Sequence, residues 1–173
     1  MSGELLYYFV EGECEQAFLK AFMHADKGEY FIKPGKVEVR NLLFDKLSNS
    51  KVMSIKRGTK VVIVFDTDIK QVDILNDNID ALLLSVGVEV IFIPSINNFE
   101  DEIVKSCSKI KNLDQILNTK GTEEFKKQFI KHKDIVSKLM SVGFDLQLMW
   151  STQPSEPFAK YKNNSSKIKE KRN

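Results

Sequence analysis

The segment KVVIVFDTD, residues 60–68, decides the fold of this chain. Residues 61–65 are apolar and, apart from Phe65, β-branched. A short, unbroken apolar run of this kind is typical of a strand buried on both faces of a parallel sheet. Asp66 and Asp68 follow at once. The segment therefore predicts a buried strand with two carboxylates at its carboxyl end.

Similar apolar runs occur before and after this segment. Residues 5–10 (LLYYFV) end at Glu11-Gly12, and residues 88–93 (VEVIFI) end at Pro94. After Gly12, apolar residues recur at helical spacing, which predicts a helix. The same spacing covers residues 72–86, and Gly87 follows where a left-handed residue commonly ends a helix. Alternating strands and helices predict an α/β fold with a mainly parallel central sheet of about four strands and helices on both faces.

The rest of the chain supplies further predicted elements and two regions. We assign residues 1–150 to one α/β domain with a C-terminal helical part, and residues 151–173 to a basic, irregular and frayed tail. The remaining elements are a loop at 26–35, a short strand at 37–39, helices at 41–54, 99–110, from 121 and at 134–142, and a late strand or buried segment at 144–150.

Composition excludes several classes of protein. With 173 residues, 42% hydrophobic and 29% charged, the chain can bury a sizeable core. A net charge of +2 does not by itself indicate nucleic acid. The start lacks the pattern of a signal peptide, and no run approaches the roughly 18 apolar residues of a membrane span. Two cysteines and two histidines are too scattered for zinc, so we expect a cytoplasmic protein with reduced thiols and no membrane.

Acidic side chains follow all three main strand ends. In a parallel sheet these ends lie along one edge, where ligands bind. Two like charges about 4 Å apart repel by roughly 4 kcal/mol at an effective dielectric near 20, and Mg²⁺ or Mn²⁺ with oxygen ligands would relieve that repulsion. The acids are Glu11 with Glu13 and Glu15, Asp66 with Asp68, and Glu100 with Asp101 and Glu102.

These acids also have purely structural explanations. Asp68 can form a turn or cap a helix, and Glu15 can be a solvated acid of a first helical turn. Glu102 is expected on the surface. Glu11 is harder to explain in this way, because it directly ends a buried strand and precedes a glycine that permits a tight turn. Its coincidence with the Asp66 pair favours a metal site.

Two segments resemble motifs of the Toprim family. Residues 8–15 (YFVEGECE) are similar to its first motif, an apolar strand followed by Glu-Gly and a further acid. Residues 61–68 (VVIVFDTD) are similar to its Asp-x-Asp motif. The resemblance covers roughly residues 4–105. Residues 95–101 (SINNFED) are also similar to the Phe-Glu segment of small RloB-like and OLD-like Toprim nucleases of bacterial defence systems.

The resemblance implies a Rossmann-like Toprim fold and a nuclease that hydrolyses DNA or RNA with Mg²⁺ or Mn²⁺, in phage defence or RNA processing. It implies the following roles: Glu11, Asp66 and Asp68 catalytic and metal-binding, Glu100 a further metal ligand, and Glu15, Asp101 and Lys70 secondary. Residues 69–71 (IKQ) replace the glycine common in topoisomerases and primases. That departure and the short chain favour a stand-alone nuclease or a subunit with a protein partner.

The basic tail is a second candidate contact with nucleic acid. Lysines bind phosphate backbones without reading sequence, and aromatic rings stack on bases. The alternatives are a solubilising tail and, for Trp150, a place in the core; Tyr161 is the other candidate for stacking. The candidate lysines are Lys160, Lys162, Lys167 and Lys169.

Two rival functions stay open. One is a catalytically silent, Toprim-like nucleic-acid-binding or regulatory subunit. The other is a receiver-type phospho-switch domain, which also gathers acids and Mg²⁺ at strand ends. A receiver carries paired acids after its first strand and a lone aspartate after its third, whereas here a glutamate comes first and the aspartate pair later.

Overall fold

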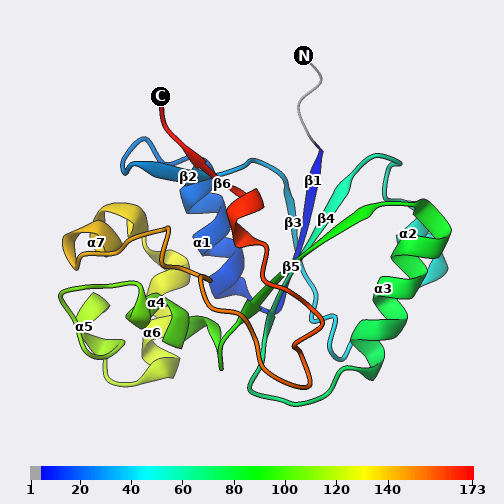
Figure 1. Ribbon diagram of the computed structural model, residues 1–173. Helices are drawn as coiled ribbons and strands as arrows, with labels where there is room; N and C mark the ends of the chain where they lie inside the picture. Colours follow the sequence, from blue (N-terminus) through cyan, green and yellow to red (C-terminus); the bar gives the residue numbers. More distant parts are fainter. Residues whose placement is uncertain (1–4) are drawn as a thin grey trace.

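A computed structural model describes residues 5–173 (Figure 1). Its central sheet has four parallel strands in the order β3-β1-β4-β5. The predicted α/β, Rossmann-like class is therefore confirmed. The strands are β1 (Leu6–Val10), β3 (Lys36–Val39), β4 (Lys60–Asp66) and β5 (Glu89–Ser95).

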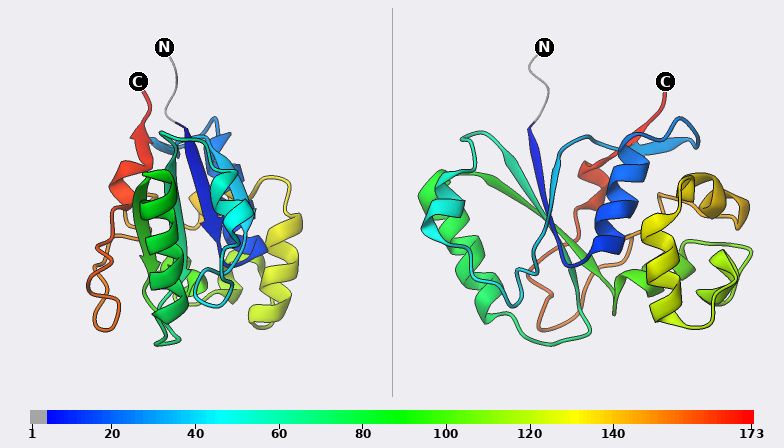
Figure 2. Two further views of the ribbon diagram at one scale, coloured as in Figure 1. Left: turned by 90° about the vertical axis from the view of Figure 1, so that its right-hand side faces the viewer. Right: turned by 180° about the vertical axis from the view of Figure 1, so that it is seen from behind.

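Helices cover both faces of this sheet because alternate strand side chains enter two separate cores. Tyr8 and Val10 of β1 belong to one core, and Tyr7 and Phe9 belong to the other. The two layers lie on opposite sides of the sheet in Figure 2. The first layer contains α1 (Glu13–Met23), α4 (Phe99–Lys105), α5 (Asp114–Leu117), α6 (Thr122–Lys131) and α7 (Ile135–Ser141), and the second contains α2 (Asn49–Met53) and α3 (Asp73–Val86).

The connections diverge between the two central strands. β1 leads through α1 to β3, its neighbour on one side, while β4 leads through α3 to β5, its neighbour on the other. The carboxyl ends of β1 and β4 therefore flank a topological switch point, where doubly wound sheets bind their ligands. Glu11 and Asp66 lie at these two ends.

The predicted helix at 41–54 is wrong in its first part, since α2 begins only at Asn49. The side chain of Asn78 on α3 fixes this stretch in a turn. Its amide donates to the carbonyls of Leu42 (3.0 Å) and Asp45 (2.9 Å), and its oxygen accepts from the backbone N–H of Leu47 (2.7 Å). Backbone groups held by a side chain in this way are not available to a helical ladder.

β5 continues through Pro94, which the sequence predicts as its end. Pro94 lies opposite Phe65, and the strand ends at Ser95. β5 is an edge strand, where a residue without an N–H is tolerated. After α4, residues 144–150 form turns rather than a strand, with a single bridge between Phe144 and Cys107. The segment is only partly buried, since Asp145, Gln147 and Leu148 are exposed.

Residues 151–164 are irregular, as predicted, but the tail is anchored and not frayed, so that part of the expectation is wrong. A 3₁₀ turn (Ser165–Lys167) leads into β6 (Lys169–Lys171), which pairs antiparallel with β2 (Tyr30–Ile32) inside the predicted loop. Ile168 is fully buried, and Phe158 packs in the second core. These apolar side chains anchor the tail. None of the helices in residues 5–173 is long and apolar enough to cross a membrane.

Candidate functional site

An acidic cavity of about 370 Å³ opens at the switch point between β1 and β4. It receives side chains from two central strand ends, from the first turns of α1 and α4, and from α6. We call it the acidic cavity. Its lining residues are Glu11, Gly12, Glu13, Cys14, Glu15, Asn41, Asp66, Glu100, Lys126 and Ile130.

Glu11 has a buried carboxylate oxygen, Oε1, with no hydrogen-bond partner among the described residues. Burial raises the pKa of Glu11 to about 7, the charges of Glu15 and Asp68 add to the rise, and a backbone hydrogen bond with Asp66 opposes it. Nearly all buried polar atoms in proteins are hydrogen-bonded, so this oxygen is an exception that needs an explanation.

Asp66 faces the same difficulty as Glu11. Burial raises its pKa to about 9, with the charges of Glu11, Glu15 and Glu100 adding to the rise and a hydrogen bond with the Ser95 side chain lowering it. Two neighbouring buried carboxyls cannot both ionise at neutral pH without a compensating cation. The metal-free site therefore holds protons that a cation would displace.

Glu15 is not the solvated acid of the structural alternative, since it is only 6% exposed. Burial raises its pKa, and backbone groups of Glu15 and Gly12 partly oppose the rise. Gly12 leaves room for this carboxylate: a Cβ at that position would lie 3.0 Å from Oε2 of Glu15. The Glu-Gly pair of the sequence motif thus places two acids, Glu11 and Glu15, in one cavity.

Asp68 is exposed and lies outside the cavity lining. Its charge still raises the pKa of Glu11, which places it close to the site. The loop that carries Asp68 is held against the segment after β5. The backbone N–H of Asp68 donates to the carbonyl of Asn97 (3.0 Å), and that of Thr67 donates to the carbonyl of Ser95 (3.1 Å). Lys70, two residues later, is exposed and does not line the cavity.

Lys126 of α6 is a member of the site that sequence reasoning missed. Its Nζ lies 3.2 Å from Oε1 of Glu100, whose side chain is 12% exposed. Burial lowers the pKa of Lys126, but Glu100, Cys14 and Glu15 outweigh that effect and raise it. Glu100 thus enters the cavity as predicted, with one oxygen already held by a lysine. No pattern in the sequence links α6 to the strand ends.

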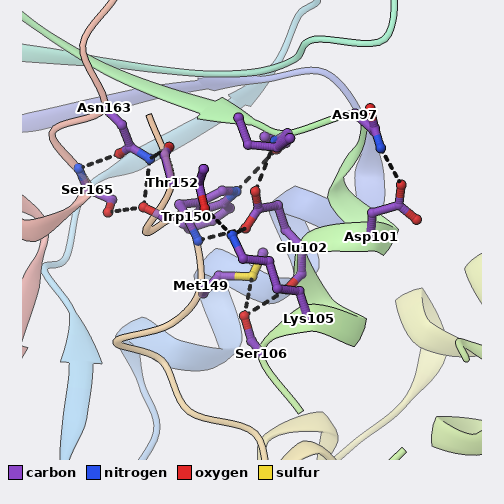
Figure 3. Close-up of polar contacts among 12 residues, drawn as sticks. Asn97, Asp101, Glu102, Lys105, Ser106, Met149, Trp150, Thr152, Asn163 and Ser165 are labelled. Atoms are coloured by element: carbon purple, nitrogen blue, oxygen red, sulfur yellow. Dashed lines mark hydrogen bonds and ion pairs between the residues drawn. The ribbon is translucent and has the colours of Figure 1, made fainter. Parts of the chain in front are cut away.

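The neighbours of Glu100 do not line the acidic cavity. Figure 3 shows Asp101 beside Asn97, and Glu102 beside Trp150. Asp101 is exposed and accepts a hydrogen bond from Nδ2 of Asn97 at 3.2 Å. The expectation that Glu102 lies on the surface is wrong, since it is 1% exposed. Its two oxygens accept from the backbone N–H groups of Ile96 (2.9 Å) and Trp150 (3.0 Å).

The aromatic candidates for base stacking are buried. Trp150 is fully buried, and its Nε1 donates to Oγ of Ser95 at 3.2 Å. The core explanation for Trp150 is therefore confirmed. Tyr161 is 3% exposed, and its hydroxyl donates to Asn76 of α3. Neither ring is available to a base.

The predicted lysines of the tail divide into two pairs. Lys167 forms an ion pair with Glu89 at 2.7 Å, and Lys169 donates to the backbone carbonyls of Gln147 and Met149. Lys160 and Lys162 are exposed. The tail therefore presents two exposed lysines instead of a continuous basic surface, and Nζ of one of them, Lys160, lies 5.1 Å from the centroid of the Tyr161 ring.

The donor set fits a hard divalent cation, although the ligand shell that the protein supplies is incomplete. Among residues 5–173, no three His, Cys, Asp or Glu side chains form a ready-made metal site. Mg²⁺ commonly takes only one or two carboxylates and completes its shell with water and phosphate oxygens. Glu11 and Asp66 supply such oxygens. Burial raises the pKa of Cys14 to about 12, so its thiol stays protonated and is a poor metal ligand.

Comparisons with known proteins add no relative. No family model matches the chain, and neither the curated proteins nor the solved structures contain a match.

Proposed function

We propose that this protein is a divalent-metal-dependent nuclease of the Toprim kind, which hydrolyses phosphodiester bonds of DNA or RNA. One observation carries the proposal: Glu11 and Asp66 meet at the switch point with raised pKa values and one buried oxygen without a partner. The resemblance of residues 8–15 and 61–68 to the two Toprim motifs supplies the reaction class.

Asp66 and one oxygen of Glu11 would hold Mg²⁺ or Mn²⁺, with Asp68 adding negative charge at the mouth of the cavity. A bound divalent ion polarises a phosphate and lowers the pKa of water. Glu11, with a pKa near 7, is matched to accept a proton at neutral pH. Lys126 supplies the positive charge that a phosphate entering this acidic cavity requires, while Glu100 positions it.

The proposal extends to the cellular location of the protein and to its partners. Cys14 and Cys107 are both free thiols, which supports the proposed cytoplasmic location. The likeness of residues 95–101 to defence nucleases supports a role in phage defence, with RNA processing as the alternative. Lys160 and Lys162 are the tail residues that remain available to a nucleic-acid backbone.

The decisive experiment incubates the purified chain with labelled single- and double-stranded DNA and with RNA, in Mg²⁺, Mn²⁺ or EDTA. We expect cleavage that needs metal and falls about a hundredfold or more in Glu11→Gln and Asp66→Asn. The matched control is Asp101→Asn, which changes an exposed acid outside the cavity and should cleave like the wild type.

Absence of cleavage by the folded wild type with either metal would favour the silent binding subunit. Full activity of Asp66→Asn would mean that the cleavage does not take place in the acidic cavity. An acid-labile acyl phosphate on the chain, formed from a small phosphodonor, would instead support the receiver.

A further inference from the structure

A second cavity, of about 390 Å³, lies apart from the acidic cavity and shares no lining residue with it. It opens between the segment at 147–153 and the segment at 163–169, beside Tyr30 of β2. Of the described residues that line it, none is Asp or Glu, and one is a lysine, Lys169. We call it the Lys169 cavity. Its electrostatic character is opposite to that of the acidic cavity.

Lys169 is fixed in place with one donor to spare. Its Nζ donates to the carbonyl of Gln147 at 3.3 Å and to the carbonyl of Met149. An ammonium has three N–H donors, so one is left for a ligand. Burial lowers the pKa of Lys169 to about 8, with Glu102 and Asp145 opposing, and the group is still charged at neutral pH.

The floor of the Lys169 cavity is rigid. Nδ2 of Asn163 (2.7 Å) and Oγ of Ser165 (2.6 Å) both donate to the carbonyl of Trp150, as Figure 3 shows. Trp150 has a left-handed backbone, with φ of 54°, and its N–H is held by the buried Glu102. A left-handed conformation is costly for a bulky residue and persists only where its surroundings enforce it. This floor is therefore built before any ligand arrives.

The rim, in contrast, has donors without partners. The side chains of Tyr30, Gln147, Ser151 and Ser166 line the cavity and make no hydrogen bond within residues 5–173. Together with the spare N–H of Lys169 they surround one space from three chain segments. Several donors around one cation match an anion with several oxygens, such as a phosphate, better than a two-oxygen carboxylate.

We propose that the Lys169 cavity binds a phosphomonoester that carries a nucleoside. The phosphate would lie against Lys169 and the serine hydroxyls. The cavity exceeds the volume of a phosphate alone and falls in the range of pockets for small molecules. Tyr30 offers an aromatic face, and Gln147 an amide, to the attached base. The ligand is either a free nucleotide or the phosphorylated end of a nucleic-acid strand.

The chain contains a reporter for this site. Trp150 is its one tryptophan, and its carbonyl is bonded to two residues that line the cavity. We would follow its fluorescence in metal-free buffer while adding inorganic phosphate, adenosine 5′-monophosphate, adenosine, or a trinucleotide with a 5′-phosphate or a 5′-hydroxyl. Isothermal calorimetry on the same solutions would detect binding that leaves the emission unchanged.

Saturable binding is expected for the phosphate-bearing ligands and not for adenosine or the 5′-hydroxyl trinucleotide. Lys169→Met should weaken it about ten- to a hundredfold, the loss typical of a charged hydrogen bond. Ser166→Glu, which leaves the contacts of Lys169 in place, should weaken it as strongly by charge repulsion. The control Lys133→Met removes an exposed lysine outside both cavities and should change affinity less than about twofold.

Binding of adenosine 5′-monophosphate without the 5′-phosphorylated trinucleotide would assign the site to a free nucleotide, and binding of both would assign it to a strand end. The proposal is overturned if no phosphate-bearing ligand binds by either method. It is equally overturned if Lys169→Met and Ser166→Glu, shown to be folded by circular dichroism, bind like the wild type. Because no metal is present, neither outcome depends on the acidic cavity.

Discussion

Glu11 and Glu102 each bury a carboxylate oxygen close to the carboxyl edge of the sheet, and they differ in how those oxygens are hydrogen-bonded. Both oxygens of Glu102 accept backbone N–H groups, from Ile96 and Trp150. Oε1 of Glu11 has no such partner. A satisfied buried acid stabilises the fold, whereas an unsatisfied one costs free energy that a ligand can recover. The difference separates a carboxylate that joins two segments from one that is available to a cation.

The largest expected effect on the free energy of unfolding comes from Glu102, the acid whose oxygens are hydrogen-bonded. Glu102→Leu would leave two buried N–H groups without an acceptor, at about 1–3 kcal/mol each. We expect the free energy of unfolding, measured with urea, to fall by about 2–5 kcal/mol. Glu123→Leu on the exposed start of α6 is the control and should change it by less than about 0.5 kcal/mol. A loss no greater than that of the control would contradict the structural role of Glu102.

The opposite sign is expected for the buried acids of the metal-free cavity, Glu11 and Asp66. With a folded pKa of about 9, Asp66 must take up a proton on folding at pH 8, which costs stability. Asp66→Asn removes that cost, so in EDTA at pH 8 it should raise the free energy of unfolding by about 1–3 kcal/mol. Urea unfolding at that pH measures the change. Asp101→Asn, at an exposed acid, is the matched control. Destabilisation by Asp66→Asn would mean that burial of Asp66 carries no cost in the metal-free protein and that the contrast with Glu102 is wrong.

The comparison also predicts how stability depends on pH. The folded pKa values of Glu11 and Asp66, about 7 and about 9, lie above their ordinary values of 4.5 and 3.8. The folded state therefore holds more protons than the unfolded state between pH 4 and 9. Stability from these groups is fully present below pH 4 and is lost as the pH rises through 7 to 9.

In EDTA, the urea midpoint of the wild type should therefore fall from pH 5 to pH 9 by more than that of the double variant Glu11→Gln/Asp66→Asn. Parallel curves for the two proteins would show that these carboxyls have ordinary pKa values.

The positions of Glu11 and Asp66 could be predicted from the sequence, whereas the burial of Glu102 could not. Glu11 and Asp66 each end an unbroken apolar run, so strand burial, parallel topology and the position of the acids follow from local pattern. Glu100, Asp101 and Glu102 are three consecutive acids with no local difference. Glu100 pairs with Lys126 of α6, and Glu102 accepts from the backbone of Trp150. Both partners reach these acids only through tertiary packing, so no local pattern distinguishes them.

The tail shows the same limit. Its six cations in fourteen residues predict a solvated, frayed end. Burial of Phe158, Tyr161 and Ile168, at irregular spacing, outweighs that composition and pairs β6 with β2. A strand of three residues with alternating lysines has no periodicity from which a partner over 130 residues earlier could be inferred.

The smallest expected effect concerns metal binding. If Glu11 and Asp66 hold a cation, then Mg²⁺ should raise the free energy of unfolding by about 1–2 kcal/mol at concentrations several-fold to tens-fold above its dissociation constant. The gain should be larger at pH 8 than at pH 5.5, because fewer protons then compete for the two carboxyls.

Thermal unfolding with and without Mg²⁺ measures this gain, and each variant tests one side of the comparison. Asp66→Asn should abolish the gain, while Glu102→Gln, although less stable throughout, should keep it. A gain that persists in Asp66→Asn would place the cation elsewhere on the chain. A gain lost in Glu102→Gln alone would mean that the fully hydrogen-bonded acid, and not the unpartnered one, governs the metal, which would reverse the argument from hydrogen-bond satisfaction.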